Sequence, residues 1–142
     1  MNLLVNTLAT IAAGTVRASG AFAQSAVVPI DSKPAPRLIV EKPLPGPLAQ
    51  GVVCIPSRVE NFRILPIGGA AARNVSPRVG HLHITVDDLP WQWADYGQSN
   101  TILLVGMPRG EHKVLIEVAD AEGHVFTGQT VTCYAPGKEA RP

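Results

Sequence analysis

Two histidines, His81 and His83, stand two residues apart in the segment GHLHITVDDLPWQW at positions 80–93. Alternate side chains of a β-strand point to the same face, so an extended segment would hold both imidazoles on one side, with Cβ atoms roughly 6–7 Å apart. Two imidazoles so placed can bind Cu²⁺, Zn²⁺ or Ni²⁺ when a third ligand completes the site. We expect that ligand to be Glu117, from a neighbouring strand, or Asp87 on the same strand.

The same pattern also has a purely structural interpretation. Leu82, Ile84 and Val86 alternate with the histidines and form the expected core face. Polar residues such as His and Thr are common on the solvent face of a half-exposed strand. A structural strand, or a face for another ligand, therefore stays open beside the metal site.

Three aromatic residues, Trp91, Trp93 and Tyr96, follow this strand, which we expect to end at Pro90. Their functional interpretation is a platform for a sugar or another flat small ligand. The alternative is a hydrophobic plug that closes one end of a small β-sandwich.

The chain has two cysteines, Cys54 and Cys133. An even number of cysteines in an oxidising compartment favours a disulfide. We expect this bridge because the first strand of the predicted fold can lie beside the last. Two separate buried thiols that act as small apolar residues are the alternative.

Motifs of catalysis are absent from the sequence: it has no G-x-S-x-G, no P-loop, no G-x-G-x-x-G and no H-E-x-x-H. We interpret both cysteines as structural and expect that the protein is not an enzyme.

His112 shares the strand parity of Val114 and Ile116, so we expect it on the core face with a corner hydrogen bond to the backbone.

Short β segments separated by turn residues must position these side chains. Six or seven strands at this spacing favour a sandwich or a small barrel. The segment VGMPRGEHKVLIEVADAEGHV resembles the last strands of immunoglobulin-like domains. We therefore predict an all-β, immunoglobulin-like antiparallel sandwich of about seven strands, with the histidine strand beside the strand that contains Glu117. The expected strands cover residues 51–55, 58–65, 81–87, 101–106, 112–119 and 125–135.

The first 23 residues have the pattern of a signal peptide, because an apolar stretch precedes the A-x-A sequence at 21–23. The stretch is shorter than the roughly 20 residues that span a bilayer. We therefore expect a periplasmic or secreted protein with no membrane span in the mature chain. A Pro-rich extended arm at 24–50, the sandwich at 51–136 and a tail at 137–142 complete the expected organisation. A short strand around residues 38–40 of the arm stays open.

Charge argues against nucleic acid as a partner. Cleavage after Ala23 removes Arg17, so the formal net charge of +1 becomes zero. Nucleic-acid-binding domains usually carry a basic patch, and no basic block is present.

From about Leu38 to Pro136 the chain resembles a family of small exported bacterial proteins of unknown function. The run SPRVGHLHITVDDLPWQWAD, together with GMPRGEHKVLIEVAD, carries this resemblance. It implies a secreted β-sandwich and no particular mechanism. It also implies that Gln92 stands where relatives often have histidine.

We predict from these observations a non-enzymatic binding module that takes a small ligand or a protein on the face around the HLH strand and the WQW loop. A periplasmic copper- or zinc-binding protein that uses His81 and His83 is the alternative. A purely structural or interaction module is the third class.

Overall fold

A computed structural model describes residues 32–89 and 92–136. The predicted signal peptide, the C-terminal tail at 137–142 and Trp91 lie outside the described residues. Among the helices of the described part, none has the length and apolar character needed to cross a membrane.

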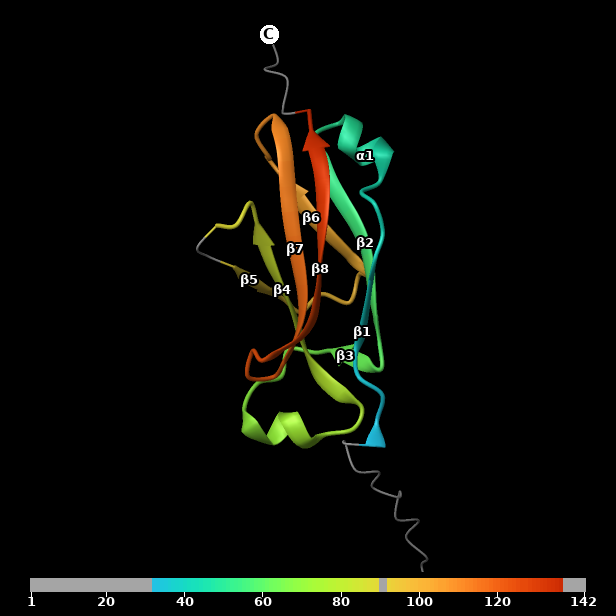
Figure 1. The fold of residues 1–142 in the computed structure, drawn as a ribbon, viewed down its shortest axis with the longest axis vertical. Coiled ribbons are helices and arrows are strands. Elements are labelled where there is room, and N and C mark those ends of the chain that lie inside the picture. Colours follow the sequence, from blue (N-terminus) through green and yellow to red (C-terminus); the bar gives the residue numbers. More distant parts are fainter. Residues whose placement is uncertain (1–31, 90–91, 137–142) are drawn as a thin grey trace, which may run out of the picture.

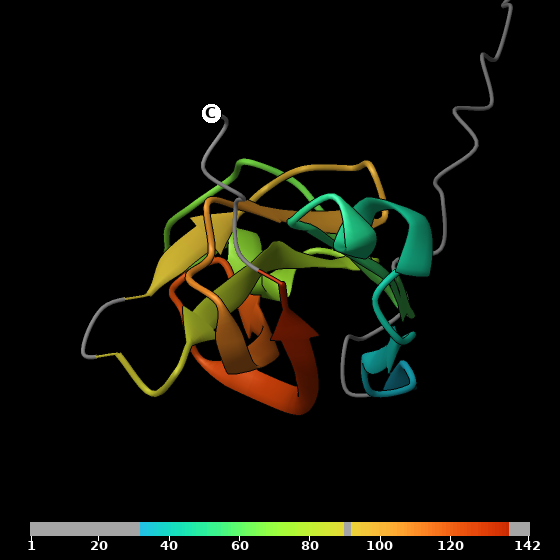
Figure 2. The same ribbon diagram turned by 90° about the horizontal axis from the view of Figure 1, so that it is seen from above.

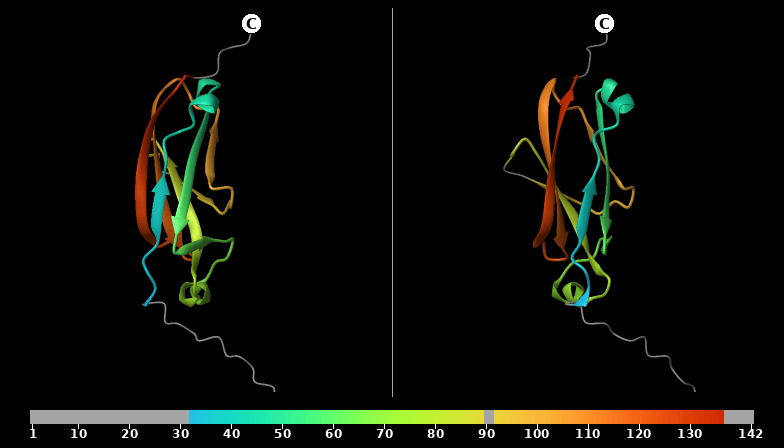
Figure 3. Two further views of the ribbon diagram at one scale, coloured as in Figure 1. Left: turned by 90° about the vertical axis from the view of Figure 1, so that its right-hand side faces the viewer. Right: turned by 45° about the vertical axis from the view of Figure 1, so that its right-hand side comes forward.

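The described strands form two sheets that pack face to face (Figures 1 and 3). The smaller sheet has the order β1-β2-β6, with β1 Arg37–Val40, β2 Val52–Glu60 and β6 Thr101–Val105. The larger sheet has the order β3-β4-β7-β8, and β5 also pairs with β4. Its strands are β3 Phe62–Ile64, β4 Arg78–Val86, β5 Trp93–Asp95, β7 Gly110–Asp120 and β8 Val125–Ala135. The predicted all-β sandwich is confirmed, with eight strands in the described residues.

Two short helices lie in the connections: α1 Pro45–Ala49 and the 3₁₀ helix η2 Ala70–Asn74. Seen from above, α1 and β5 lie on opposite sides of the molecule (Figure 2). One strand pair departs from the expected antiparallel arrangement, because β3 runs parallel to the beginning of β4.

The hydrophobic core lies between the two sheets and follows the alternation of the sequence. Leu82, Ile84 and Val86 of β4 are buried, as predicted. Burial of such an aliphatic side chain stabilises the fold by roughly 1.5–3 kcal/mol. The opposing strands contribute Val114, Ile116 and Val118 of β7, Val53 and Ile55 of β2, and Ile102 and Leu104 of β6.

Strand β2 continues through Pro56, where we expected a strand to end. Residues 52–56 pair with β6, and residues 57–60 pair with β1. Proline lacks a backbone donor and is tolerated where a ladder is interrupted. Pro56 stands where β2 exchanges one neighbour for the other, so the missing N–H does not break the strand.

The sandwich begins before residue 51, because the expected extended arm contains β1 and α1. Leu38 of β1 belongs to the core, and its carbonyl oxygen accepts a hydrogen bond from Nε2 of Gln129 in β8 at 3.0 Å. Strand β1 thus bridges the two sheets at one side. The alternation at 38–40 is too short to be distinguished from an extended linker by pattern alone.

The predicted Cys54–Cys133 disulfide is wrong, since both thiols are free. Cys54 alternates with the buried Val53 and Ile55, so its side chain faces outward from the smaller sheet. Cys133 is buried on the core side of β8 in the larger sheet. In the smaller sheet, the strand that approaches β8 is β1 and not β2, and this removes the topological reason for the bridge.

Candidate functional site

The two histidines lie together on the outer face of β4. Their Nε2 atoms are 2.9 Å apart and their ring centroids are 4.8 Å apart. His81 is buried with 6% of its surface exposed, whereas His83 is half-buried. The strand prediction correctly placed both imidazoles on one side. At this distance the two nitrogens share one proton in an N–H···N hydrogen bond.

Tyr96 covers the imidazole of His81. The two ring centroids are 4.8 Å apart with an interplanar angle of 38°. The antiparallel β4–β5 register pairs His83 with Ala94, and Tyr96 follows two residues later on the same face. Stacking buries His81 although it lies on the outer side of the sheet.

The Nδ1 atom of His81 is buried and has no hydrogen-bond partner among the described residues. Burial lowers the pKa of His81 below its ordinary value, and the nearby His83 lowers it further against the opposing effect of Asp120. The imidazole is therefore held neutral at neutral pH. A buried polar group left without a partner costs about 1–3 kcal/mol, so this nitrogen is an unusual feature of the site.

The turn between β7 and β8 approaches His83 from the other side. Gly123 has a φ of +89°, and a Cβ at this position would lie 3.7 Å from Cε1 of His83. The left-handed backbone favours glycine here, whereas the imidazole lies at an ordinary van der Waals distance. The turn therefore forms one wall beside the histidine pair.

Neither expected carboxylate completes a metal site with the two histidines. Asp87 follows the end of β4 with a φ of +54°, and its Oδ2 lies 2.6 Å from Nδ1 of His112. Glu117 is the cross-strand neighbour of His83, as expected, but its Cγ lies over Gly128 on the β8 side. Within the described part of the chain, no three His, Cys, Asp or Glu side chains gather to hold a metal ion.

The expected aromatic platform does not form a single surface in the described residues. Trp93 is opposite Ile84 in the β4–β5 register and packs against the core. Tyr96 lies on the outer face against His81 and is 41% exposed. Trp93 therefore contacts the core and Tyr96 contacts His81, while the platform and the plug both stay predictions.

His112 makes the predicted corner hydrogen bond to the backbone. Its Nε2 donates to the carbonyl oxygen of Pro108 at 2.8 Å, and its Nδ1 donates to Asp87. The hydrogen bond to Asp87 raises the pKa of His112, and the bond to Pro108 raises it further. The same contact with His112 lowers the pKa of Asp87. This pair fastens the end of β4 to β7 and is structural.

Sequence reasoning missed a polar cluster around Asp120, beside the histidines. Oδ1 of Asp120 accepts hydrogen bonds from the backbone N–H groups of Glu122 and His124 at 2.8 and 2.9 Å. Arg73 of η2 lies 3.3 Å from its Oδ2. Burial alone would raise the pKa of Asp120, but the backbone hydrogen bonds and the His124 side chain together outweigh it and lower that pKa. The sequence from Asp120 to Gly123 is a turn signal, but it does not reveal that Arg73 approaches from η2.

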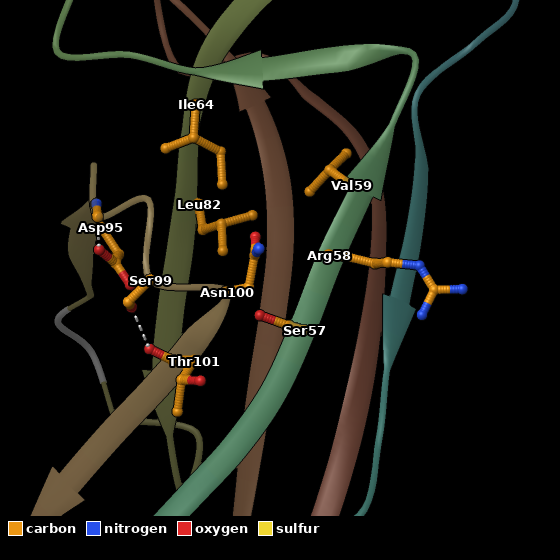
Figure 4. A pocket seen from close by; sticks show the side chains of 10 residues that line it. Ser57, Arg58, Val59, Ile64, Leu82, Asp95, Ser99, Asn100 and Thr101 are labelled. Atoms are coloured by element: carbon orange, nitrogen blue, oxygen red, sulfur yellow. Dashed lines mark hydrogen bonds between the residues drawn. The ribbon is translucent and has the colours of Figure 1, made fainter.

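A separate hollow lies between β2, β3 and the connection that precedes β6. Its inner part is lined by residues that include Ser57, Ile64, Leu82 and Asn100 (Figure 4) and has a volume of about 10 Å³. That is room for about one water molecule. The open groove beside it, next to Phe62 and Arg63, has a volume of about 240 Å³. Neither hollow includes the histidine pair.

Fold and site together define an all-β sandwich with a histidine pair on the outer face of its larger sheet. The chain belongs to a protein family described as Family of unknown function (DUF6130), whose model matches residues 2–142. The match confirms the resemblance to a family of unknown function. No curated protein and no solved structure matches the chain.

Proposed function

We propose that this protein is an exported, non-enzymatic binding protein that takes a small ligand on its histidine face. The histidine face is the outer surface formed by His81, His83 and Tyr96. Export rests on the signal-peptide pattern of the first 23 residues, and the location proposed is the periplasm or the exterior of the cell.

One observation carries this proposal: His81 is buried beneath Tyr96 and is hydrogen-bonded through its Nε2 atom to His83. Replacement of both partners of such a hydrogen bond by apolar groups of the same shape can be nearly neutral or stabilising. Folding alone therefore gives no reason for an imidazole under Tyr96. A ligand that engages the pair gives such a reason, and the half-buried His83 supplies its access.

Binding is favoured over catalysis because the cysteine that pairs with His112 in the β7–β8 register is a poor nucleophile. Cys133 is the cross-strand neighbour of His112, but burial raises the pKa of its thiol. A thiol that stays protonated is a poor nucleophile. The imidazole of His112 is moreover engaged by Asp87 and Pro108.

A copper or zinc ion bound by His81 and His83 is the second candidate. The observation that favours it is the short distance between the two Nε2 atoms. Ring nitrogens of histidine are common ligands of copper and zinc. Because neither Glu117 nor Asp87 joins the pair, the remaining ligands of this site would be water or donors from outside the chain.

Native mass spectrometry of the full chain, purified from the cell without denaturation, tests the proposed function for any ligand. We expect the native mass to exceed the denatured mass by one ligand, and His83→Ala to abolish the difference. His124→Ala is the matched control, because the His124 side chain is 66% exposed and lies outside the pair. Equal native and denatured masses, or the same bound mass in both variants, would contradict the proposal.

A further inference from the structure

We propose that the ligand of the histidine face is Cu²⁺, held by Nε2 of His81 and Nε2 of His83 at adjacent corners of a square-planar site. This inference rests on the proposed function and names the chemical class of its ligand.

The separation of the two nitrogens selects the geometry. With metal–imidazole bonds of about 2.0–2.1 Å, adjacent corners of a square lie about 2.9 Å apart, and two corners of a tetrahedron lie about 3.3 Å apart. The observed separation of the Nε2 atoms is 2.9 Å. It matches the square, which Cu²⁺ and Ni²⁺ favour, better than the tetrahedron that Zn²⁺ favours. Without the metal, the same spacing holds one hydrogen bond.

The fold holds the first ligand in position before the metal arrives. His81 is fixed by the stacked ring of Tyr96 and by its burial, and His83 is placed two residues farther along the same strand.

The donor set selects the metal further. Asp87 is engaged by His112 and by the backbone N–H of Lys113, and Asp120 is engaged by Arg73 and two backbone N–H groups. Two nitrogen donors without a carboxylate do not suit Ca²⁺ or Mg²⁺, which need oxygen ligands. Among divalent metals on nitrogen ligands, affinity is highest for Cu²⁺. The remaining corners of the square are left to water or to a donor from outside the chain.

Calorimetry and electron paramagnetic resonance with Cu²⁺ alone, added to the full chain at neutral pH, test this inference. We expect one equivalent of Cu²⁺ per chain, with a resonance split by two equivalent imidazole nitrogens. His83→Ala should weaken binding by about tenfold or more and leave one such nitrogen, because one of two protein ligands is lost. His124→Ala should change neither result.

Three outcomes would overturn the copper assignment. They are the absence of Cu²⁺ binding, a spectrum unchanged by His83→Ala, and Zn²⁺ binding as tight as that of Cu²⁺. His83 is half-buried and is the safer position to change, and circular dichroism of each variant verifies its fold. Native mass spectrometry could show a bound mass that depends on His83 while the chain binds no Cu²⁺. In that case the proposed function stands and only the copper assignment is rejected. Failure of both experiments removes both.

Discussion

At the scale of single residues, His81, His83 and His112 have different roles because their hydrogen-bond partners differ. His81 is buried beside His83 and keeps one nitrogen without a partner among the described residues, whereas His112 uses both nitrogens as donors. A group whose two nitrogens both donate to oxygen acceptors is an imidazolium. Sequence parity predicted the face of each of these three rings. It could not predict their partners, because those depend on turns and on neighbouring strands.

The His112–Asp87 pair gives a pH dependence with a definite sign. The folded pKa of His112 is raised above 6.5, so its contribution to the free energy of unfolding is complete below pH 6.5 and is lost as pH rises through the raised value. The folded pKa of Asp87 is lowered below 3.8, so its contribution is complete above pH 3.8 and is lost as pH falls through the lowered value.

We expect Asp87→Asn to lower the free energy of unfolding at pH 6 by about 1 kcal/mol, because solvent screens a charged hydrogen bond whose carboxylate is 38% exposed. The decline of stability above pH 6.5 should flatten in this variant, because the anion that raises the His112 pKa is gone. Urea unfolding from pH 3 to pH 9 measures both effects. The neighbouring Asp88→Asn is the matched control, and an equal loss in the two variants would contradict the role given to Asp87.

At the scale of elements, the histidine strand was predicted correctly because its apolar and its polar residues both alternate with the period of a β-strand. Leu82, Ile84 and Val86 occupy one face, and the neighbouring strand contributes Glu117 opposite His83, as expected. The end of the strand was predicted less well. Asp87 leaves the alternation through a positive φ, and a sequence pattern does not reveal such a local change of backbone direction when the residue is not glycine.

Close approach of β4 and β7 makes Gly80 sensitive to substitution. A Cβ there would clash with the carbonyl oxygen of Ala119 and with the ring of Phe62. We expect Gly80→Ala to lower the free energy of unfolding by about 2–3 kcal/mol, because backbone atoms cannot move aside cheaply. Denaturant unfolding measures this change.

Gly46→Ala in α1 is the matched control for Gly80→Ala. A Cβ at Gly46 has nothing within 4 Å, and alanine is favoured over glycine within helices by roughly 0.5–1 kcal/mol. We expect this variant to be neutral or slightly stabilised. If both substitutions had equal effects, the close contact at Gly80 would not be present in solution.

At the scale of the whole molecule, the class of fold followed from the spacing of strands and turns, but the partition of strands between sheets did not. Pairing of Cys54 with Cys133 required β2 beside β8, and β1 occupies that place instead. Short strands such as β1 carry too few residues to reveal their partner. Long-range pairing is decided by the packing of the complete core, for which the local pattern gives no register.

Two free cysteines have a measurable consequence for the whole chain. Because Cys54 faces outward on one sheet and Cys133 faces inward on the other, we expect two reactive thiols per denatured chain and the same free energy of unfolding with and without a reductant. Thiol titration in denaturant and mass spectrometry of the unreduced protein measure this. The disulfide prediction would be restored by two results together. The unreduced chain would be lighter by two hydrogens, and a reductant would remove both this mass difference and some of the chain's stability.

The histidine face is tested most directly by the ring-nitrogen NMR spectrum of the full chain labelled with ¹⁵N-histidine, recorded during addition of Cu²⁺. All four histidines report in one spectrum, so His112 and His124 serve as internal controls. We predict that the signals of His81 and His83 broaden together at substoichiometric Cu²⁺ while those of His112 and His124 persist. Equal broadening of all four histidines, or loss of His124 first, would contradict a ligand site at His81 and His83.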